Sequence, residues 1–261
     1  MPSLSSIPNC KFVDIHSHVL YGMDDGAQTL EQSVEMLEMA AQGGTTDIVG
    51  TPHSDLTYQF QPDLIAERVG ELNTALGGRI HVHHGCDFHL HFDNIQDCLA
   101  NPAKFTINHK RYLLVEFADS QIPYTTAEVF RRMAYLDITP VITHPERNPL
   151  LRERLDEITT WVRAGCLVQV TAQSFLDRFG KPARHAADEM MERRLVHFVA
   201  SDAHDPEDRT PLLADAFAYV SQRYGEPKAK ALFSDHPRAT LTGQYLDVED
   251  PGEVKKRKWF W

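Results

Sequence analysis

The fold of this chain is decided by the stretch FVDIHSHV at residues 12–19. Its β-branched and aromatic residues predict a strand. Side chains alternate between the two faces of a strand, so His16 and His18 share one face and the apolar residues beside them pack on the other. Two imidazoles on one face can bind a single cation, although an isolated H-x-H pair is equally consistent with two surface or core histidines.

Short apolar runs continue to alternate with amphipathic stretches along the chain, a pattern that predicts βα units around a parallel sheet or barrel. The predicted strands cover residues 12–19, 47–51, 79–84, 112–117, 139–143, 167–171 and 196–201. The predicted helices cover residues 29–42, 62–76, 126–136, 150–163, 183–193 and 211–223. The sequence has no internal repeat and no shift in composition, so we expect one domain at 12–246, an extension at 1–11 and a tail at 247–261.

The composition is that of an acidic globular protein with many histidines. Among 261 residues, 26 Lys and Arg against 37 Asp and Glu give a net charge of −11, which argues against a protein that coats nucleic acid. An apolar content of 42% excludes a wholly disordered chain. Fourteen histidines point to metal chemistry or general acid–base catalysis, and composition alone does not decide between them.

The sequence predicts a cytoplasmic protein with reduced thiols. Its start lacks a basic segment followed by an apolar run, and nowhere do eighteen apolar residues stand together. The four cysteines form no C-x-x-C pair; they are Cys10, Cys86, Cys98 and Cys166. The basic and aromatic end KKRKWFW at 255–261 could contact an anionic membrane surface or a partner, but a solvated tail is the simpler interpretation.

Imidazole or carboxylate side chains stand at the carboxyl ends of six of the seven predicted strands. In a barrel these ends converge on one mouth, where active sites are built. With Asp25 from the loop after the first strand they offer nine nitrogen or oxygen ligands, too many for one ion, so we expect a cluster of two or three. Such a mixed set favours Mn²⁺, Fe²⁺ or Zn²⁺ over Ca²⁺ or Mg²⁺. The nine residues are His16, His18, Asp25, His53, Asp87, Glu116, His144, Asp202 and His204.

Two arginines follow ligand positions closely, Arg147 after His144 and Arg209 after His204. The planar guanidinium group pairs two phosphate oxygens and stabilises charge that develops during phosphoryl transfer. Each arginine could instead pair with acidic neighbours, but their place on the mouth loops favours phosphate. No cysteine is followed by five residues and an arginine, and the P-loop, G-x-S-x-G and H-E-x-x-H motifs are missing, which excludes the motif-based rivals.

Six motifs, in this order over residues 12–246, resemble the PHP (polymerase and histidinol phosphatase) superfamily: DIHSHVLYGMDDGA, TPH, HGCDF, LLVEF, ITPVITHPER and VASDAHDPEDR. They are most similar to its bacterial protein-tyrosine phosphatases of capsular and exopolysaccharide operons. The resemblance implies a distorted (β/α)7 barrel, TIM-like and single-domain, with three metal ions, commonly manganese. It also implies that Arg147 and Arg209 bind phosphate.

The resemblance also implies a ligand set for each ion. These sets are His16, His18, Asp87 and Asp202 for the first; Asp87 as a bridge with Glu116 and His144 for the second; and Asp25, His53 and His204 for the third. The hypothesis that follows is a phosphomonoesterase in which a metal-activated hydroxide attacks phosphotyrosine on a protein, an exopolysaccharide-assembly tyrosine kinase. The alternatives are a small-molecule phosphatase such as histidinol phosphatase, and a non-catalytic metal-binding partner of a membrane complex.

The sequence departs from the family pattern at two places. The bridging position, usually glutamate, is Asp87, which is one methylene shorter. His89 and His91 follow it and could compensate, but the simpler interpretation is that both are exposed loop histidines. The extension before residue 12 is the second departure, because chains of this family begin almost directly at the first strand.

Overall fold

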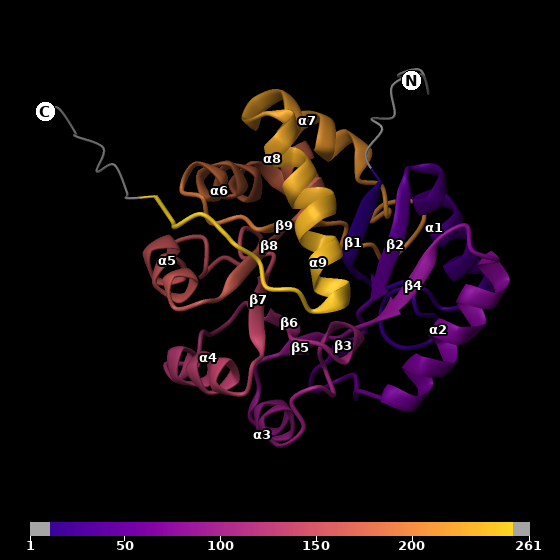
Figure 1. Cartoon of the computed structure of the whole chain (residues 1–261), viewed down its shortest axis with the longest axis horizontal. Helices are drawn as coiled ribbons and strands as arrows, with labels where there is room; N and C mark the ends of the chain where they lie inside the picture. The colour runs from indigo at the N-terminus through magenta and orange to yellow at the C-terminus, as the bar shows by residue number, and fades with distance from the viewer. Residues whose placement is uncertain (1–10, 253–261) are drawn as a thin grey trace, which may run out of the picture.

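Helices surround a central group of parallel strands in the computed structural model, which describes residues 11–252 (Figure 1). The strands are β1 Phe12–Ser17, β2 Thr45–Gly50, β3 His53–Ser54, β4 His81–His84, β5 Asp87–His89, β6 Tyr112–Glu116, β7 Thr139–Thr143, β8 Leu167–Thr171 and β9 Phe198–Ala200. The helices are α1 Leu30–Gln42, α2 Pro62–Leu76, α3 Phe92–Ala100, α4 Thr126–Tyr135, α5 Leu155–Arg163, α6 Gly180–Glu192, α7 Ala214–Tyr224, α8 Glu226–Lys230 and α9 His236–Thr242.

The strands follow one another around a distorted barrel. One parallel sheet has the order β1-β2-β4 and the other the order β3-β5-β6-β7-β8-β9. After short breaks at residues 51–52 and 85–86, β3 continues the path of β2 and β5 that of β4. A bridge between Ser17 and Ala203 joins the end of β1 to the segment after β9, where the amide of His18 donates to the carbonyl of Ala203 at 2.8 Å. The predicted TIM-like (β/α)7 barrel is confirmed.

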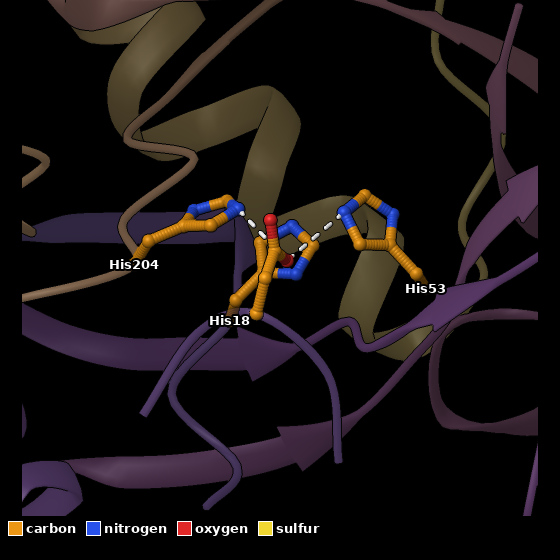
Figure 2. Close-up of side chains that lie close together, drawn as sticks. His18, His53 and His204 are labelled. Atoms are coloured by element: carbon orange, nitrogen blue, oxygen red, sulfur yellow. Dashed lines mark ion pairs between the residues drawn. The ribbon is translucent and has the colours of Figure 1, made fainter. Parts of the chain in front are cut away.

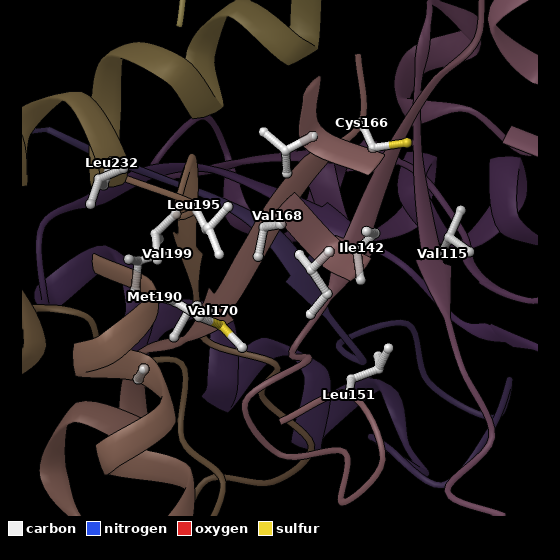
Figure 3. Packing of buried hydrophobic residues seen from close by; sticks show 14 of the residues in the cluster. Val115, Ile142, Leu151, Cys166, Val168, Val170, Met190, Leu195, Val199 and Leu232 are labelled. Carbon is white, nitrogen blue, oxygen red and sulfur yellow. The ribbon is translucent and has the colours of Figure 1, made fainter. Parts of the chain in front are cut away.

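Both faces of the strands are buried, as a parallel sheet covered by helices requires. Val115, Ile142 and Val168 project outward and pack in the largest core cluster, part of which Figure 3 shows. Leu114 and Val141, their neighbours on β6 and β7, fill the interior of the barrel instead. Close packing on both faces makes the strands a rigid frame, so their carboxyl ends hold side chains in defined positions.

Most differences from the predicted elements lie at helix ends. The helix predicted at 150–163 begins at Leu155, because the side-chain oxygen of Asn148 accepts the amides of Leu150 and Leu151 and holds a turn there. Helices α3, α8 and α9 were not predicted. Both α8 and α9 have a proline in their first turn, which suits a helix start, and α9 crosses the strands in Figure 1.

Two sequence predictions fall on residues outside the described range. These are the tail at 255–261 and the extension at 1–11, of which only Lys11 is described. Within 11–252, none of the helices has both the length and the apolar character needed to span a bilayer.

Candidate metal centre

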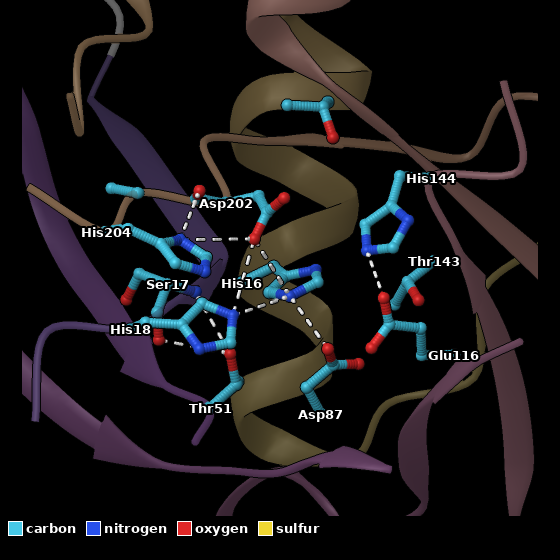
Figure 4. Close-up of polar contacts among 12 residues, drawn as sticks. His16, Ser17, His18, Thr51, Asp87, Glu116, Thr143, His144, Asp202 and His204 are labelled. Carbon is cyan, nitrogen blue, oxygen red and sulfur yellow. Dashed lines mark hydrogen bonds and ion pairs between the residues drawn. The ribbon is translucent and has the colours of Figure 1, made fainter. Parts of the chain in front are cut away.

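The carboxyl ends of the strands and the loops that follow them bring all nine predicted ligand residues into one group, which we call the mouth cluster. Figure 4 shows most of this group, without Asp25 and His53. Within it, sets of three or four side chains offer ligand atoms that lie within 4.8 Å of one another. These sets are His18, Asp25, His53 and His204; His16, His18 and Asp87; His16, His144 and Asp202; Asp87, Glu116 and His144; and a fifth that adds His89 to His53 and Glu116.

The two histidines of the first strand motif face each other across the centre of the mouth cluster. The Nε2 atoms of His16 and His18 are 3.4 Å apart, and Asp202 Oδ1 lies 3.4 Å from the first and 3.3 Å from the second. Gln169 Oε1 lies 2.9 Å from His16 Nδ1, and Asp24 Oδ2 lies 2.7 Å from His18 Nδ1. These oxygens accept, so each Nδ1 carries a hydrogen, and when a cation replaces the proton on Nε2 its lone pair points into the cluster.

The other side of the cluster combines two further histidines with Asp25. Asp25 Oδ1 lies 3.4 Å from His53 Nε2 and 3.5 Å from His204 Nε2, and Figure 2 shows these two rings on either side of His18. Burial and the neighbouring His18 lower the pKa of His204 to about 3. The ring is therefore neutral near pH 7, the form in which an imidazole binds a cation.

The environment of the Asp87 carboxylate indicates whether the cluster suits a metal ion. Its side chain is fully buried, and its Oδ2 lies 3.1 Å from His53 Nδ1 and 3.6 Å from His16 Nε2, while Oδ1 has no hydrogen-bond partner among the described residues. Burial opposes the charged form, but the imidazole of His16 outweighs it and holds the pKa of Asp87 well below its usual range. A buried, ionised carboxylate needs a paired charge or a metal ion, and imidazoles with carboxylates are ligands that suit Mn²⁺, Fe²⁺ or Zn²⁺. The residues fit such a cation.

Two members of the cluster hold a strained backbone. His144 and Asp202 have φ values of 32° and 53°, in a region that non-glycine residues rarely adopt. Such conformations cost about 1–3 kcal/mol each and persist where the surrounding structure enforces them, commonly at functional sites. Burial and the charge of Arg147 lower the pKa of His144 to about 4, so this imidazole is also neutral near pH 7.

Both predicted arginines reach the mouth cluster. The guanidinium of Arg209 donates to Asp202 Oδ2 at 2.6 Å, and that of Arg147 contacts the same oxygen. Arg147 also lies over the ring of Phe179, with 4.2 Å from its central carbon to the ring centroid. Because two guanidinium groups share one acceptor beside the cluster, an anion held there receives donors from both.

A cavity of about 310 Å³ opens beside the cluster. Its polar wall is formed by His89, Glu116, His144 and Arg147, and its apolar wall by Phe117, Leu151 and Phe179. A ligand in this space meets both charged groups and aromatic or aliphatic surface.

Asp24 and Gln169, which were not among the predicted residues, orient histidines of the cluster from outside it. Asp24 Oδ2 accepts from His18 and also from the amide of His53 at 3.0 Å. The signals were available: an acidic residue beside Asp25, and one polar side chain inside the apolar strand LVQVT at 167–171. His89 was interpreted as an exposed loop residue, and this was wrong, because it lies on β5 against Glu116.

The loop that carries Asp24 and Asp25 depends on Gly26. A Cβ atom at Gly26 would lie 2.1 Å from the carbonyl oxygen of His18, so only glycine allows the loop to approach β1 this closely. The amide of Gly26 donates to Asp24 Oδ1 at 2.9 Å, and the side-chain amide of Gln28 donates to the carbonyls of Asp24 and Gly26. The loop is thus held so that Asp24 reaches His18.

Asp24→Asn is expected to weaken metal binding without unfolding the chain. An asparagine can turn its NH₂ group toward His18 Nδ1, which moves the ring hydrogen to Nε2 and removes the lone pair from the cluster. Loss of such an outer partner lowers metal affinity by roughly 10–100-fold. Titration of the metal-depleted protein with Mn²⁺ measures the effect. Asp55→Asn is the matched control, since Asp55 accepts backbone amides in a loop outside the cluster; equal affinities for the two variants would contradict the role of Asp24.

The fold and the position of the mouth cluster place the chain among the TIM-like α/β barrels. The phosphotriesterase homology protein from Escherichia coli shares this fold, with a TM-score of 0.56 and 8% identity over 90% of this chain and 99% of that one. More specifically, the chain belongs to the family described as capsular polysaccharide synthesis, CpsB/CapC, whose model matches residues 12–242.

Several members of this family resemble the chain over nearly its full length. The tyrosine-protein phosphatase YwqE of Bacillus subtilis is 31% identical over 252 residues, which cover 95% of this chain and 98% of that protein. The tyrosine-protein phosphatase CpsB of Streptococcus pneumoniae is 29% identical, over 90% of this chain and all of that protein. A solved structure from work on YwqE and CpsB, described as unique metal-dependent tyrosine phosphatases, has a TM-score of 0.87 at 29% identity and covers 94% of this chain and 100% of that one.

Proposed function

We propose that this chain is a metal-dependent tyrosine-protein phosphatase that hydrolyses phosphotyrosine on a protein partner. The observation that carries the proposal is the mouth cluster beside two arginines and a partly aromatic cavity. Relatives of the same length at about 30% identity are named for this activity. The family description makes a tyrosine kinase of polysaccharide assembly the partner that we propose.

Three cations, Mn²⁺ in our proposal, would be held by the mouth cluster. The ligands would be His16, His18, Asp87 and Asp202 for one; Asp87, Glu116 and His144 for the second; and Asp25, His53 and His204 for the third. The close sets His16, His18 and Asp87; Asp87, Glu116 and His144; and His18, Asp25, His53 and His204 support this division, whereas Asp202 is grouped with His16 and His144. When bound, such ions polarise phosphoryl oxygens and acidify a water molecule. Gln169 and Asp24 keep His16 and His18 in the tautomer that leaves Nε2 free to bind.

Arg147 and Arg209 would hold the phosphoryl group against the cluster. Their guanidinium groups both donate to Asp202 Oδ2, so a phosphoryl oxygen that enters the site competes for the same donors. Fixed donors of this kind offset the charge that grows on the phosphoryl oxygens in the transition state. The ring of Phe179 lies against the guanidinium of Arg147 and restricts its movement. The N–H groups of Arg147 therefore stay directed toward the site.

The cavity suits an aryl phosphate. A phosphate placed at Arg147 leaves the attached ring in a cavity whose lining includes Phe117, Leu151 and Phe179, where apolar contact would stabilise it. The tyrosine phenolate is a fair leaving group, because its conjugate acid has a pKa of about 10. A strong general acid is therefore not required for this substrate.

A comparison of substrates tests the proposed function. We expect kcat/KM with Mn²⁺ to be higher on a phosphotyrosyl peptide than on histidinol phosphate by a factor on the order of 10². The peptide offers an apolar phenyl ring and a phenolate leaving group, whereas histidinol phosphate offers a polar imidazole, a cationic amine and a poorer, alkoxide leaving group. Faster hydrolysis of histidinol phosphate would identify a small-molecule phosphatase instead. No turnover of either ester would favour a metal-binding module without catalysis.

A further inference from the structure

His89 stands where β5 and β6 end together at the mouth. It follows Asp87 by two residues on the same strand, so both side chains point to the same face. In the parallel pairing of β5 with β6, His89 lies opposite Glu116. Its side chain is only 23% exposed, and its Nε2 contacts Glu116 Oε2. The register of the two strands, and not a flexible loop, therefore brings this imidazole to the cluster.

Glu116 presents its two oxygens to different histidines. Oε1 lies 3.5 Å from His144 Nε2, whereas Oε2 faces His89 and lies 3.4 Å from His53 Nδ1. The ring centroids of His53 and His89 are 5.8 Å apart. Ligand atoms of His53, His89 and Glu116 all lie within 4.8 Å of one another, a spacing that allows one cation to contact all three. Nitrogen and carboxylate oxygen atoms in this arrangement form a coordination set for a divalent transition metal.

We propose that His89 is a further metal ligand, which binds, together with Glu116, the cation at the β5–β6 end of the mouth cluster. This inference rests on the proposed function in that both require the cluster to bind cations. The set that contains His89, which is His53, His89 and Glu116, shares Glu116 with the set Asp87, Glu116 and His144, so His89 adds a further side chain on the Oε2 side of Glu116. Four protein ligands hold a transition metal more firmly than three, and three are typical of sites that keep a position open.

The neighbouring His91 provides an internal contrast. It also follows Asp87 by an even number of residues, but β5 ends at His89 and His91 stands at the N-cap of α3. None of the sets of potential ligands in the described residues includes His91. Strand alternation alone therefore does not distinguish the two histidines, whereas their positions in the fold do.

The test is a metal-binding measurement on the full-length chain that needs no substrate. His89→Asn and His89→Asp have nearly the same shape, but only aspartate supplies a charged oxygen ligand. We expect His89→Asn to lower the weakest Mn²⁺ affinity by roughly 10–100-fold or more, as loss of an outer partner already does. His89→Asp should recover most of that loss, and His91→Asn should bind as the unaltered chain does.

Cobalt provides a second readout. In protein loaded with Co²⁺, the visible absorption spectrum should change for His89→Asn, because one imidazole nitrogen leaves the coordination sphere, and should stay unchanged for His91→Asn. Wild-type Mn²⁺ stoichiometry and affinity together with an unchanged Co²⁺ spectrum in His89→Asn would overturn the inference. An unaltered chain that binds cations but does not hydrolyse phosphotyrosine would refute the proposed function alone, so the two failures are distinguishable.

Discussion

Chelation with EDTA is expected to abolish hydrolysis of an aryl phosphate, and added Mn²⁺ is expected to restore it. In the proposed mechanism the imidazoles and carboxylates of the mouth cluster serve as metal ligands, and the attacking group is a water molecule that bound cations acidify. Chelation removes those cations and with them the source of hydroxide near pH 7. The rate with p-nitrophenyl phosphate, before and after chelation, measures the effect.

Thiol alkylation is the complementary control for a cysteine-based mechanism. Burial raises the pKa of Cys98 and of Cys166 to about 12, and it raises the pKa of Cys86 well above its usual range. These thiols are therefore protonated near pH 7 and react slowly. Activity should survive iodoacetamide. Loss of activity on alkylation together with resistance to EDTA would reverse the conclusion.

Metal removal is expected to lower thermal stability as well. A ligand present at about 100 times its dissociation constant stabilises the folded state by about 2.7 kcal/mol. For a domain of this size that corresponds to a melting temperature higher by something on the order of 5–10 °C. Differential scanning calorimetry of the loaded and chelated protein checks this, and identical transitions would show that the cluster binds no cation tightly.

The fold was largely predictable because the strands are buried on both faces and separated by amphipathic helices. Each of the seven predicted strand regions contains a strand, whereas the short strands β3 and β5, which follow the breaks at 51–52 and 85–86, were not predicted. At the second break the backbone comes so close to β2 that a Cβ atom at Gly85 would lie 2.5 Å from the side chain of Val49. Helix α3 was missed because it has only nine residues and no side chain caps its start, although Ile95, Cys98 and Leu99 form a short apolar stripe that packs on the core.

In the mouth cluster, the ligand residues could be predicted from the sequence, but the residues that orient them could not. Its nine members could be found because the sequence shows where each strand ends, and the ends of all strands converge at one mouth of a barrel. Gln169 and Asp24 could not be found in this way, because their roles depend on which ring nitrogen each one reaches after folding. His89 was misjudged for a related reason: its environment is set by the pairing of β5 with β6, which the sequence of β5 does not contain.

The net charge of the whole chain does not describe the charge at the mouth cluster. A net charge of −11 would repel a phosphorylated partner if it were spread evenly. Four of these negative charges belong to Asp25, Asp87, Glu116 and Asp202, which lie together in the cluster. Three divalent cations would more than neutralise them, and Arg147 and Arg209 add positive charge at the same place. Phosphate therefore meets an attractive field at the site despite the acidic surface.

Arg147→Ala and Arg209→Ala should each lower kcat/KM for an aryl phosphate by a factor on the order of 10²–10³, the usual cost of removing one electrostatic donor to the transition state. Both guanidinium groups converge on Asp202 Oδ2, so each lies where a phosphoryl oxygen would be bound. Binding of inorganic phosphate, measured as product inhibition, should weaken in both variants, while Mn²⁺ content should not change. Lysine at either position should recover only part of the loss, because an ammonium group cannot pair two oxygens in one plane.

The chain contains a matched control for these substitutions. Arg184 also lies over an aromatic ring, 4.7 Å from the centroid of Tyr219, and pairs with a carboxylate, that of Asp177, but it lies outside the mouth cluster. Arg184→Ala removes the same kinds of contact and should leave kcat/KM unchanged, since an exposed ion pair contributes about 0–1 kcal/mol to stability. Near-wild-type activity in both Arg147→Ala and Arg209→Ala would remove these arginines from the site. A loss shared by Arg184→Ala would mean that the effect is on folding, because only a guanidinium beside the cluster can act on the phosphoryl group.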